Sequence, residues 1–153
     1  MTITVEHAGH PLTVAALVRD TRGWLLIVRG HGEDAPWYLP GGLVMPWESP
    51  SRAVHRQVRE SLGLVIEPAD LELLAVEWIE ARDPAAPGRV VLLFASGLMP
   101  QARFHDITLD GTRLGSWRLE RPRTALTLLH RQVAARLAPA LDHYPALYRE
   151  THR

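Results

Sequence analysis

The residues of clearest chemical potential lie between positions 42 and 63. On a helix, positions 56, 57, 60 and 61 share one face, because residues three and four apart are neighbours. Carboxylates on such a face, beside a glycine turn, would hold Mg²⁺, which takes one or two carboxylates, water and substrate phosphate oxygens. The ion would neutralise a diphosphate and activate water. In this chain the face forms a polar stripe of Arg56, Gln57, Glu60 and Ser61, so Glu60 is its one carboxylate.

A helix from Pro50 to Leu62 is expected to carry this polar stripe. Ser49 is a typical N-cap residue, and proline at the first helical position loses no hydrogen bond, because that N–H has no partner within a helix. Gly63 is a typical C-terminal stop. The apolar contacts of the helix are expected from Ala53, Val54, Val58 and Leu62.

The spacing around this helix matches a known pattern. Five residues separate Gly42 from Glu48, and seven more lead to Arg56; this resembles the Nudix box, G-x5-E-x7-R-E-U-x-E-E-x-G-U, where U is aliphatic. Seven of the nine specified positions match. Segment 37–42, Trp-Tyr-Leu-Pro-Gly-Gly, also resembles the strand that leads into the box in this family. The resemblance implies an α/β fold over most of the chain, a Nudix-like α/β/α sandwich with a mixed β-sheet.

The resemblance also implies roles for individual residues. Glu48 and Arg56 would pair and brace the loop against the helix, which suits arginine because its guanidinium binds a carboxylate through two hydrogen bonds. The Gly41 carbonyl and the Glu60 carboxylate would bind Mg²⁺. For Glu60 the alternative is an ion pair with Arg56 on the surface of the helix.

Two positions of the box depart from the family pattern. Gln57 stands where the family has a metal-binding or basic glutamate, and Ser61 replaces the second glutamate of the pair. Gln57 could instead donate a hydrogen bond to a phosphate or sugar oxygen. A carboxylate from outside the box could compensate, and we expect Glu80 to do so. The carboxylates considered are Glu77, Glu80, Asp106 and Asp110.

Substrate contacts are expected from the glycine turn and its surroundings. Gly42 would let the substrate approach the backbone closely. Trp47, beside the box, would cap the cavity or fill it. Arg29 could meet phosphate oxygens, as could Arg82 and Arg89, although a chain with many arginines offers such residues widely.

The other elements are predicted from hydrophobic patterning. Leu12–Val18 and Trp24–Val28 are expected to form a hairpin through the turn at 20–23. Further strands are predicted at 37–39, 71–79, 89–95 and 117–119. A second amphipathic helix is predicted over 124–141. A single Nudix-like domain is therefore expected over residues 1–153, with its core between about 12 and 141.

Composition excludes several function classes. The 153 residues carry 17 basic and 17 acidic side chains, so a general nucleic-acid or anionic-membrane binder is not expected. The chain has no Lys and no Cys, which excludes Schiff-base lysines, thiol nucleophiles and thiolate metal sites. No signal peptide or membrane span is evident, so a cytoplasmic location is expected. The expected partner is a small-molecule diphosphate, and the chain could form a homodimer.

The sequence leaves two functions open. The first, implied by the resemblance, is a hydrolase that cleaves a nucleoside diphosphate-linked or other organic diphosphate with Mg²⁺. The second is a Nudix fold that has lost hydrolysis and serves as a ligand-binding or pathway-specific accessory protein. The two missing carboxylates and the apolar segment Met45-Pro46-Trp47 favour the second.

Overall fold

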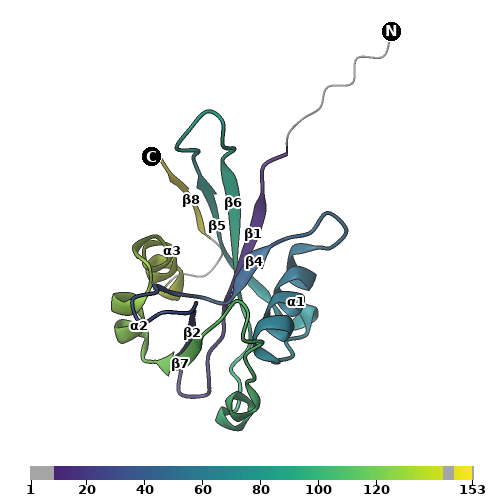
Figure 1. Ribbon diagram of the computed structural model, residues 1–153, viewed down its shortest axis with the longest axis vertical. Helices are drawn as coiled ribbons and strands as arrows, with labels where there is room; N and C mark the ends of the chain where they lie inside the picture. Colours follow the sequence, from purple (N-terminus) through teal and green to yellow (C-terminus); the bar gives the residue numbers. More distant parts are fainter. Residues whose placement is uncertain (1–8, 143–146, 153) are drawn as a thin grey trace.

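The strands form two sheets in a computed structural model that describes residues 9–142 and 147–152. The larger sheet has five strands in the order β4-β1-β6-β5-β8 (Figure 1). The smaller sheet has three, in the order β3-β2-β7. The strands are β1 (Leu12–Leu17), β2 (Leu25–Arg29), β3 (Trp37–Tyr38), β4 (Gly41–Leu43), β5 (Glu72–Ile79), β6 (Arg89–Ala95), β7 (Ser116–Glu120) and β8 (Leu147–Thr151).

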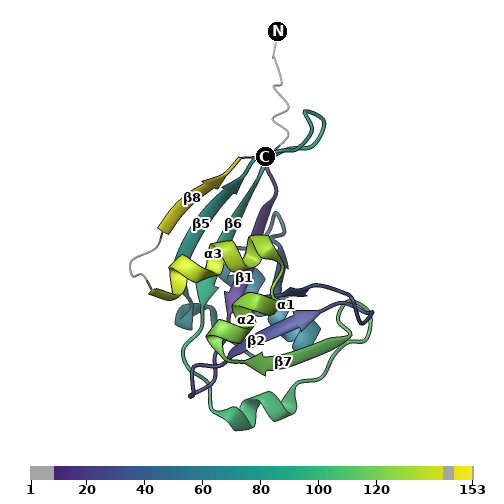
Figure 2. The ribbon, with the colours of Figure 1, turned by 90° about the vertical axis from the view of Figure 1, so that its left-hand side faces the viewer.

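The larger sheet is mixed. Strand β1 pairs antiparallel with β4 and parallel with β6, while β5 pairs antiparallel with β6 and parallel with β8. The helices are α1 (Pro50–Leu62), α2 (Pro122–Leu128) and α3 (Arg131–Asp142), with 3₁₀ turns at Pro68–Asp70 and Gln101–Asp106. Helix α1 lies on one side of the central strands, and α2 and α3 lie on the other (Figures 1 and 2). The predicted α/β/α sandwich with a mixed sheet is therefore confirmed.

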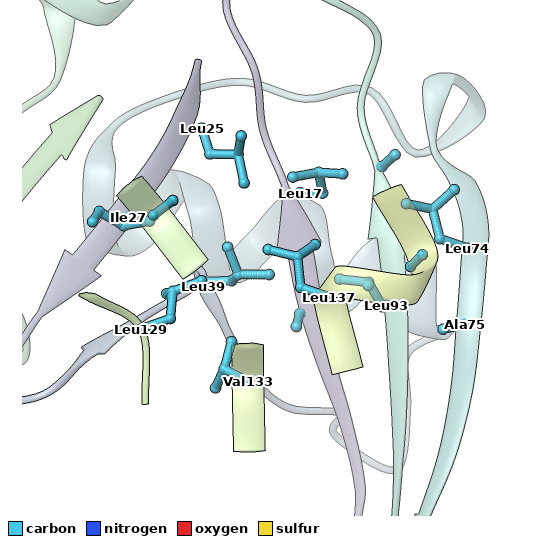
Figure 3. Packing of buried hydrophobic residues seen from close by; sticks show 14 of the residues in the cluster. Leu17, Leu25, Ile27, Leu39, Leu74, Ala75, Leu93, Leu129, Val133 and Leu137 are labelled. Atoms are coloured by element: carbon cyan, nitrogen blue, oxygen red, sulfur yellow. The ribbon is translucent and has the colours of Figure 1, made fainter. Parts of the chain in front are cut away.

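Two layers of apolar side chains hold the sandwich together. Alternate residues of β2 enter different layers, because successive side chains of a strand point to opposite faces. Leu25 and Ile27 belong to the layer beneath α2 and α3, with Leu137 (Figure 3). Leu26 and Val28 belong to the layer that holds the buried residues of α1. Burial on both faces fixes β2 at the centre of the fold.

The predicted hairpin of β1 and β2 is wrong. The turn is present, since the Asp20 amide donates to the Trp24 carbonyl and the Leu26 amide donates to the Val18 carbonyl. Beyond that turn the strands diverge, and β1 pairs with β4 and β6 while β2 pairs with β3 and β7. The cause is that both strands bury both faces, so each takes neighbours from distant parts of the chain.

Helix α1 begins and ends where the sequence predicts. The Ser49 hydroxyl accepts a hydrogen bond from the Arg52 amide at 3.4 Å, and Pro50 occupies the first turn. Gly63 adopts a left-handed conformation with φ of 70° and donates its amide to the Arg59 carbonyl. The predicted apolar residues of the helix are all buried: Ala53, Val54, Val58 and Leu62.

The predicted C-terminal helix is wrong in its continuity. It is two helices, α2 and α3, separated at Leu129, whose backbone is extended with ψ of 147°. The His130 amide donates to the Trp37 carbonyl at 2.8 Å, and Leu129 bridges to Trp37. Pairing with β3 therefore interrupts the helix, a long-range effect that local hydrophobic spacing does not contain.

Two strands were not predicted. Strand β4 is short and contains Gly41 and Gly42, a residue type with low strand preference. Strand β8 lies beyond the expected end of the core, and its pairing with β5 shows that the sheet extends past residue 141. Within the described residues, no helix has the length and apolar character needed to cross a membrane.

Candidate active site

A cavity of about 850 Å³ lies where α1, α3 and the two sheets meet around β4. Among the described residues that line it, none is an Asp or a Glu. Six are arginines: Arg29, Arg56, Arg82, Arg89, Arg113 and Arg136. A cavity with this lining is suited to an anionic ligand, because guanidinium groups bind phosphate and carboxylate through paired hydrogen bonds.

The glycines of β4 allow two close approaches at the cavity wall. A β-carbon at Gly41 would clash with the Val14 carbonyl of β1. A β-carbon at Gly42 would clash with the side-chain amide of Gln57 on α1. Both glycines line the cavity; the missing side chain of Gly41 lets β1 approach, and that of Gly42 lets Gln57 of α1 pack directly against the strand.

Glu48 and Arg56 form the pair that the resemblance implies. Arg56 Nε donates to both Glu48 carboxylate oxygens, at 2.9 and 3.1 Å, and Nη2 donates to Oε1 at 2.6 Å. Arg56 Nη2 also donates to the Leu43 carbonyl at 3.0 Å, while the Met45 amide donates to Glu48. The pair thus joins β4, the following loop and α1. Arg56 also lines the cavity.

This pair makes stability sensitive to acid. The hydrogen bond from Arg56 lowers the pKa of Glu48 below its ordinary value of 4.5. A carboxyl whose pKa is lower in the folded state stabilises the fold above its unfolded pKa, and this contribution is lost as the pH falls through the folded pKa. We expect Glu48→Gln to cost about 1 kcal/mol at pH 7 and progressively less below pH 4.5. Urea unfolding of both proteins between pH 7 and pH 3 measures this, and a pH-independent difference would contradict it.

The residues of the polar stripe differ in burial. Gln57 and Ser61 are buried and line the cavity, and the Ser61 hydroxyl donates to the Gln57 carbonyl at 2.6 Å. The Gln57 amide donates to the Leu43 carbonyl at 3.4 Å and accepts from Arg113 Nη1 at 3.4 Å. The two positions without the family's carboxylates therefore both face the cavity, together with Arg56.

Glu60 is the one residue of the polar stripe outside the cavity. Its side chain is 50% exposed and is not part of the cavity lining. Its carboxylate lies 3.4 Å from Arg56 Nη1, four residues earlier on α1. The structure therefore shows the surface ion pair that the sequence left open as the alternative, and it does not place Glu60 beside Gly41 in the cavity wall.

The expected compensating carboxylates lie elsewhere. Glu80 lies 3.4 Å from His152 Nδ1, outside the cavity lining. Glu77 is 2% exposed and paired with Arg136. Asp110 accepts backbone hydrogen bonds within its own loop. Asp106 ends a 3₁₀ turn and does not line the cavity.

Of the two expected substrate contacts outside β4, Arg29 lines the cavity and Trp47 does not. Trp47 is 80% exposed and outside the lining, so it neither caps nor fills the cavity. Arg29 does line the cavity and lies over the Trp37 ring, 4.7 Å from its centroid. Its Nε is buried with no hydrogen-bond partner in the described part of the chain. Arg113 and Arg136 were not predicted, since no spacing in the sequence connects them to the box.

The residues present do not fit a resident Mg²⁺. In residues 9–142 and 147–152, no three His, Cys, Asp or Glu side chains are grouped as metal ligands would be. Glu48 is occupied by Arg56, which also pairs with Glu60. Beside the Gly41 carbonyl the cavity offers an amide and a hydroxyl, with the Arg113 guanidinium bound to that amide. Mg²⁺ in proteins is usually held by one or two carboxylates with water and substrate phosphates, and among the described residues the cavity lining has arginines and no carboxylate.

Comparison with known proteins identifies the family. The NUDIX domain model matches residues 9–141. RNA pyrophosphohydrolases from Halorhodospira halophila and Cellvibrio japonicus are 37% and 32% identical over 82 residues, 52% of this chain. The chain spans less than half the length of these relatives, 44% and 47%.

Solved structures show the same fold at low identity. A MutT protein from Methanosarcina mazei has a TM-score of 0.69 and 19% identity, covering 91% of this chain and 97% of that one. The NUDIX domain of Shewanella oneidensis NrtR, complexed with ADP ribose, has a TM-score of 0.66 and 20% identity, covering 88% and 90%. With the family model matching most of the chain and the Glu48–Arg56 pair in place, this protein belongs to the NUDIX family.

Proposed function

We propose that this chain binds a small organic diphosphate, such as a nucleoside diphosphate-linked compound, and does so without Mg²⁺-dependent hydrolysis. The observation that carries the proposal is the cavity lined by six arginines and by no carboxylate among the described residues. Such a wall attracts phosphate oxygens and offers no site for the metal that the family resemblance implies.

Arg113 and Arg29 are the arginines most available to a diphosphate near α1. No ion pair within the described residues joins either guanidinium to a carboxylate, whereas Arg56 is already paired. Gln57 adds a side-chain amide at the same wall, and an amide can donate to a phosphate oxygen.

Among the described residues that line it, the same wall has no carboxylate to activate water, and its one imidazole is that of His130. An amide in place of a carboxylate cannot take up a proton, and the Ser61 hydroxyl is already donated to the Gln57 carbonyl. Removal of a general base typically lowers the rate about 10²- to 10⁴-fold. Binding is therefore the activity that this geometry supports best.

Calorimetric titration with ADP-ribose, in EDTA and in Mg²⁺, tests the proposal. We expect the same affinity in both buffers and no release of phosphate products. Arg113→Ala should lower the affinity about ten-fold or more, because it removes a charge-assisted contact. Arg123→Ala, an exposed arginine outside the cavity, is the matched control. Absence of binding by ADP-ribose and by simple nucleoside diphosphates would contradict the proposal.

Hydrolysis of an organic diphosphate is the second function considered. It is favoured by the relatives named RNA pyrophosphohydrolases and by the one carboxylate left in the polar stripe, Glu60, at the outer side of Arg56. The same titration decides between the two. Mg²⁺-dependent product release, measured alongside binding, would establish hydrolysis and overturn the binding-only proposal.

A further inference from the structure

The cavity has a second group of arginines, on elements other than α1. Arg89 begins β6, Arg82 lies between β5 and β6, and Arg136 projects from α3. These elements differ from those that supply Arg56, Gln57 and Arg113. We call Arg82, Arg89 and Arg136 the distal arginines.

A buried carboxylate, that of Glu77, pairs with one of the distal arginines. Glu77 on β5 is buried and pairs with Arg136, and its other oxygen accepts a hydrogen bond from Thr151 on β8 at 2.7 Å. Arg149 Nε lies 3.5 Å from the same carboxylate. Glu77 is thus already shared by two guanidiniums, and no ion pair in the described structure joins Arg82 or Arg89 to any carboxylate.

The local charge is therefore positive and uncompensated. Burial lowers the pKa of Arg136, and the neighbouring Arg89 and Arg149 lower it further, although Glu77 acts in the opposite direction. Repulsion among guanidiniums at a cavity wall is relieved when an anion binds between them. The excess of charge favours a ligand group rather than another protein contact.

The size of the cavity leads to the same conclusion. Cavities of about 300–1,000 Å³ take a whole drug-sized ligand, so 850 Å³ exceeds what one diphosphate fills. Apolar side chains, including Val91 and Val133, also line the cavity. They suit the organic part of a ligand whose charged groups bind elsewhere along the wall.

We propose that the distal arginines form a second anion subsite, so that the natural ligand is an organic diphosphate with a further phosphate or carboxylate at its other end. The proposal rests on the proposed function for the assignment of the diphosphate to the α1 side. It adds that affinity comes from two separated anionic groups.

Titration with inorganic diphosphate, in EDTA and low salt, tests this subsite independently of any organic group. We expect about two ions bound per chain in the unmodified protein. Arg82→Ala/Arg89→Ala should lower the affinity of the distal site at least about ten-fold. The site on the α1 side should keep its affinity. Arg113→Ala should affect only the site on the α1 side. Arg52→Ala/Arg123→Ala removes two exposed arginines outside the cavity, with the same change in net charge, and should leave both sites.

The outcomes separate the two proposals. A single site in the unmodified protein, or two sites that persist in Arg82→Ala/Arg89→Ala, would overturn the second subsite. ADP carries one diphosphate, so its binding at the α1 side, the part that is lost in Arg113→Ala, should change less than two-fold in Arg82→Ala/Arg89→Ala. If ADP and ADP-ribose both fail to bind the unmodified protein, the proposed function fails, whatever the number of sites for inorganic diphosphate.

Discussion

Replacing Glu77 by alanine is expected to lower the free energy of unfolding by about 3–5 kcal/mol. Glu77 is 2% exposed and Arg136, its partner, is 6% exposed, so the variant leaves a guanidinium buried without its counter-charge. Thr151 and Arg149 lose their contacts with the same carboxylate, so the side-chain contacts that supplement the backbone pairing of β5 with β8 are lost as well. Urea unfolding at neutral pH measures the effect.

The double variant Glu77→Leu/Arg136→Met is the control. Replacement of both members of a buried ion pair by apolar residues is often nearly neutral, because the cost lies in the unpaired charge rather than in the loss of the pair. We expect the double variant to be more stable than Glu77→Ala. If the two are equally destabilised, Glu77 acts through packing, and the account of an unpaired charge is wrong.

Arg56→Ala is expected to affect both stability and ligand binding. It removes three hydrogen bonds to the Glu48 carboxylate and one to the Leu43 carbonyl, so the loop between β4 and α1 loses its link to the helix. We expect a loss of about 2–3 kcal/mol in the free energy of unfolding. ADP-ribose affinity should fall by about ten-fold or more, measured by calorimetry below the unfolding temperature.

Two variants on the same helix make this result specific. Arg56→Lys keeps the charge but cannot form the paired hydrogen bonds, so it should recover part of the affinity and little of the stability. Arg52→Ala removes an exposed arginine one turn earlier and should be nearly neutral. Equal effects of Arg52→Ala and Arg56→Ala would show that only net charge matters and that the brace to Glu48 contributes nothing.

These variants also distinguish two uses of acidic residues in this fold. Glu48 and Glu77 each neutralise an arginine that lines the cavity, Arg56 and Arg136, yet neither carboxylate lines it. Glu48 and Glu77 therefore hold the arginines of the cavity wall in place without being part of the lining. This arrangement is consistent with a ligand that carries negative charge, and it differs from a wall in which carboxylates face a metal ion.

Local sequence determined where helix α1 begins and ends and which of its residues face the core. Its N-cap, its C-terminal glycine and the apolar residues of its inner side lie within fifteen positions, and each acts through neighbours in sequence. The pairing of Glu48 with Arg56 was likewise expected, as an implication of the family resemblance. The mixed sheet and the sandwich followed from the family resemblance.

Tertiary packing decided what the polar stripe does. The spacing places positions 56, 57, 60 and 61 on one face, but only the contact of α1 with the glycines of β4 sets the rotation that buries Gln57 and Ser61 and leaves Glu60 at the edge. The arginines of the cavity come from β2, α1, α3 and three separate stretches around β6 and β7, so no local pattern relates them. Local sequence determines interactions between residues that are a few positions apart. The charge of a cavity wall depends on side chains from distant parts of the chain, and only folding brings these together.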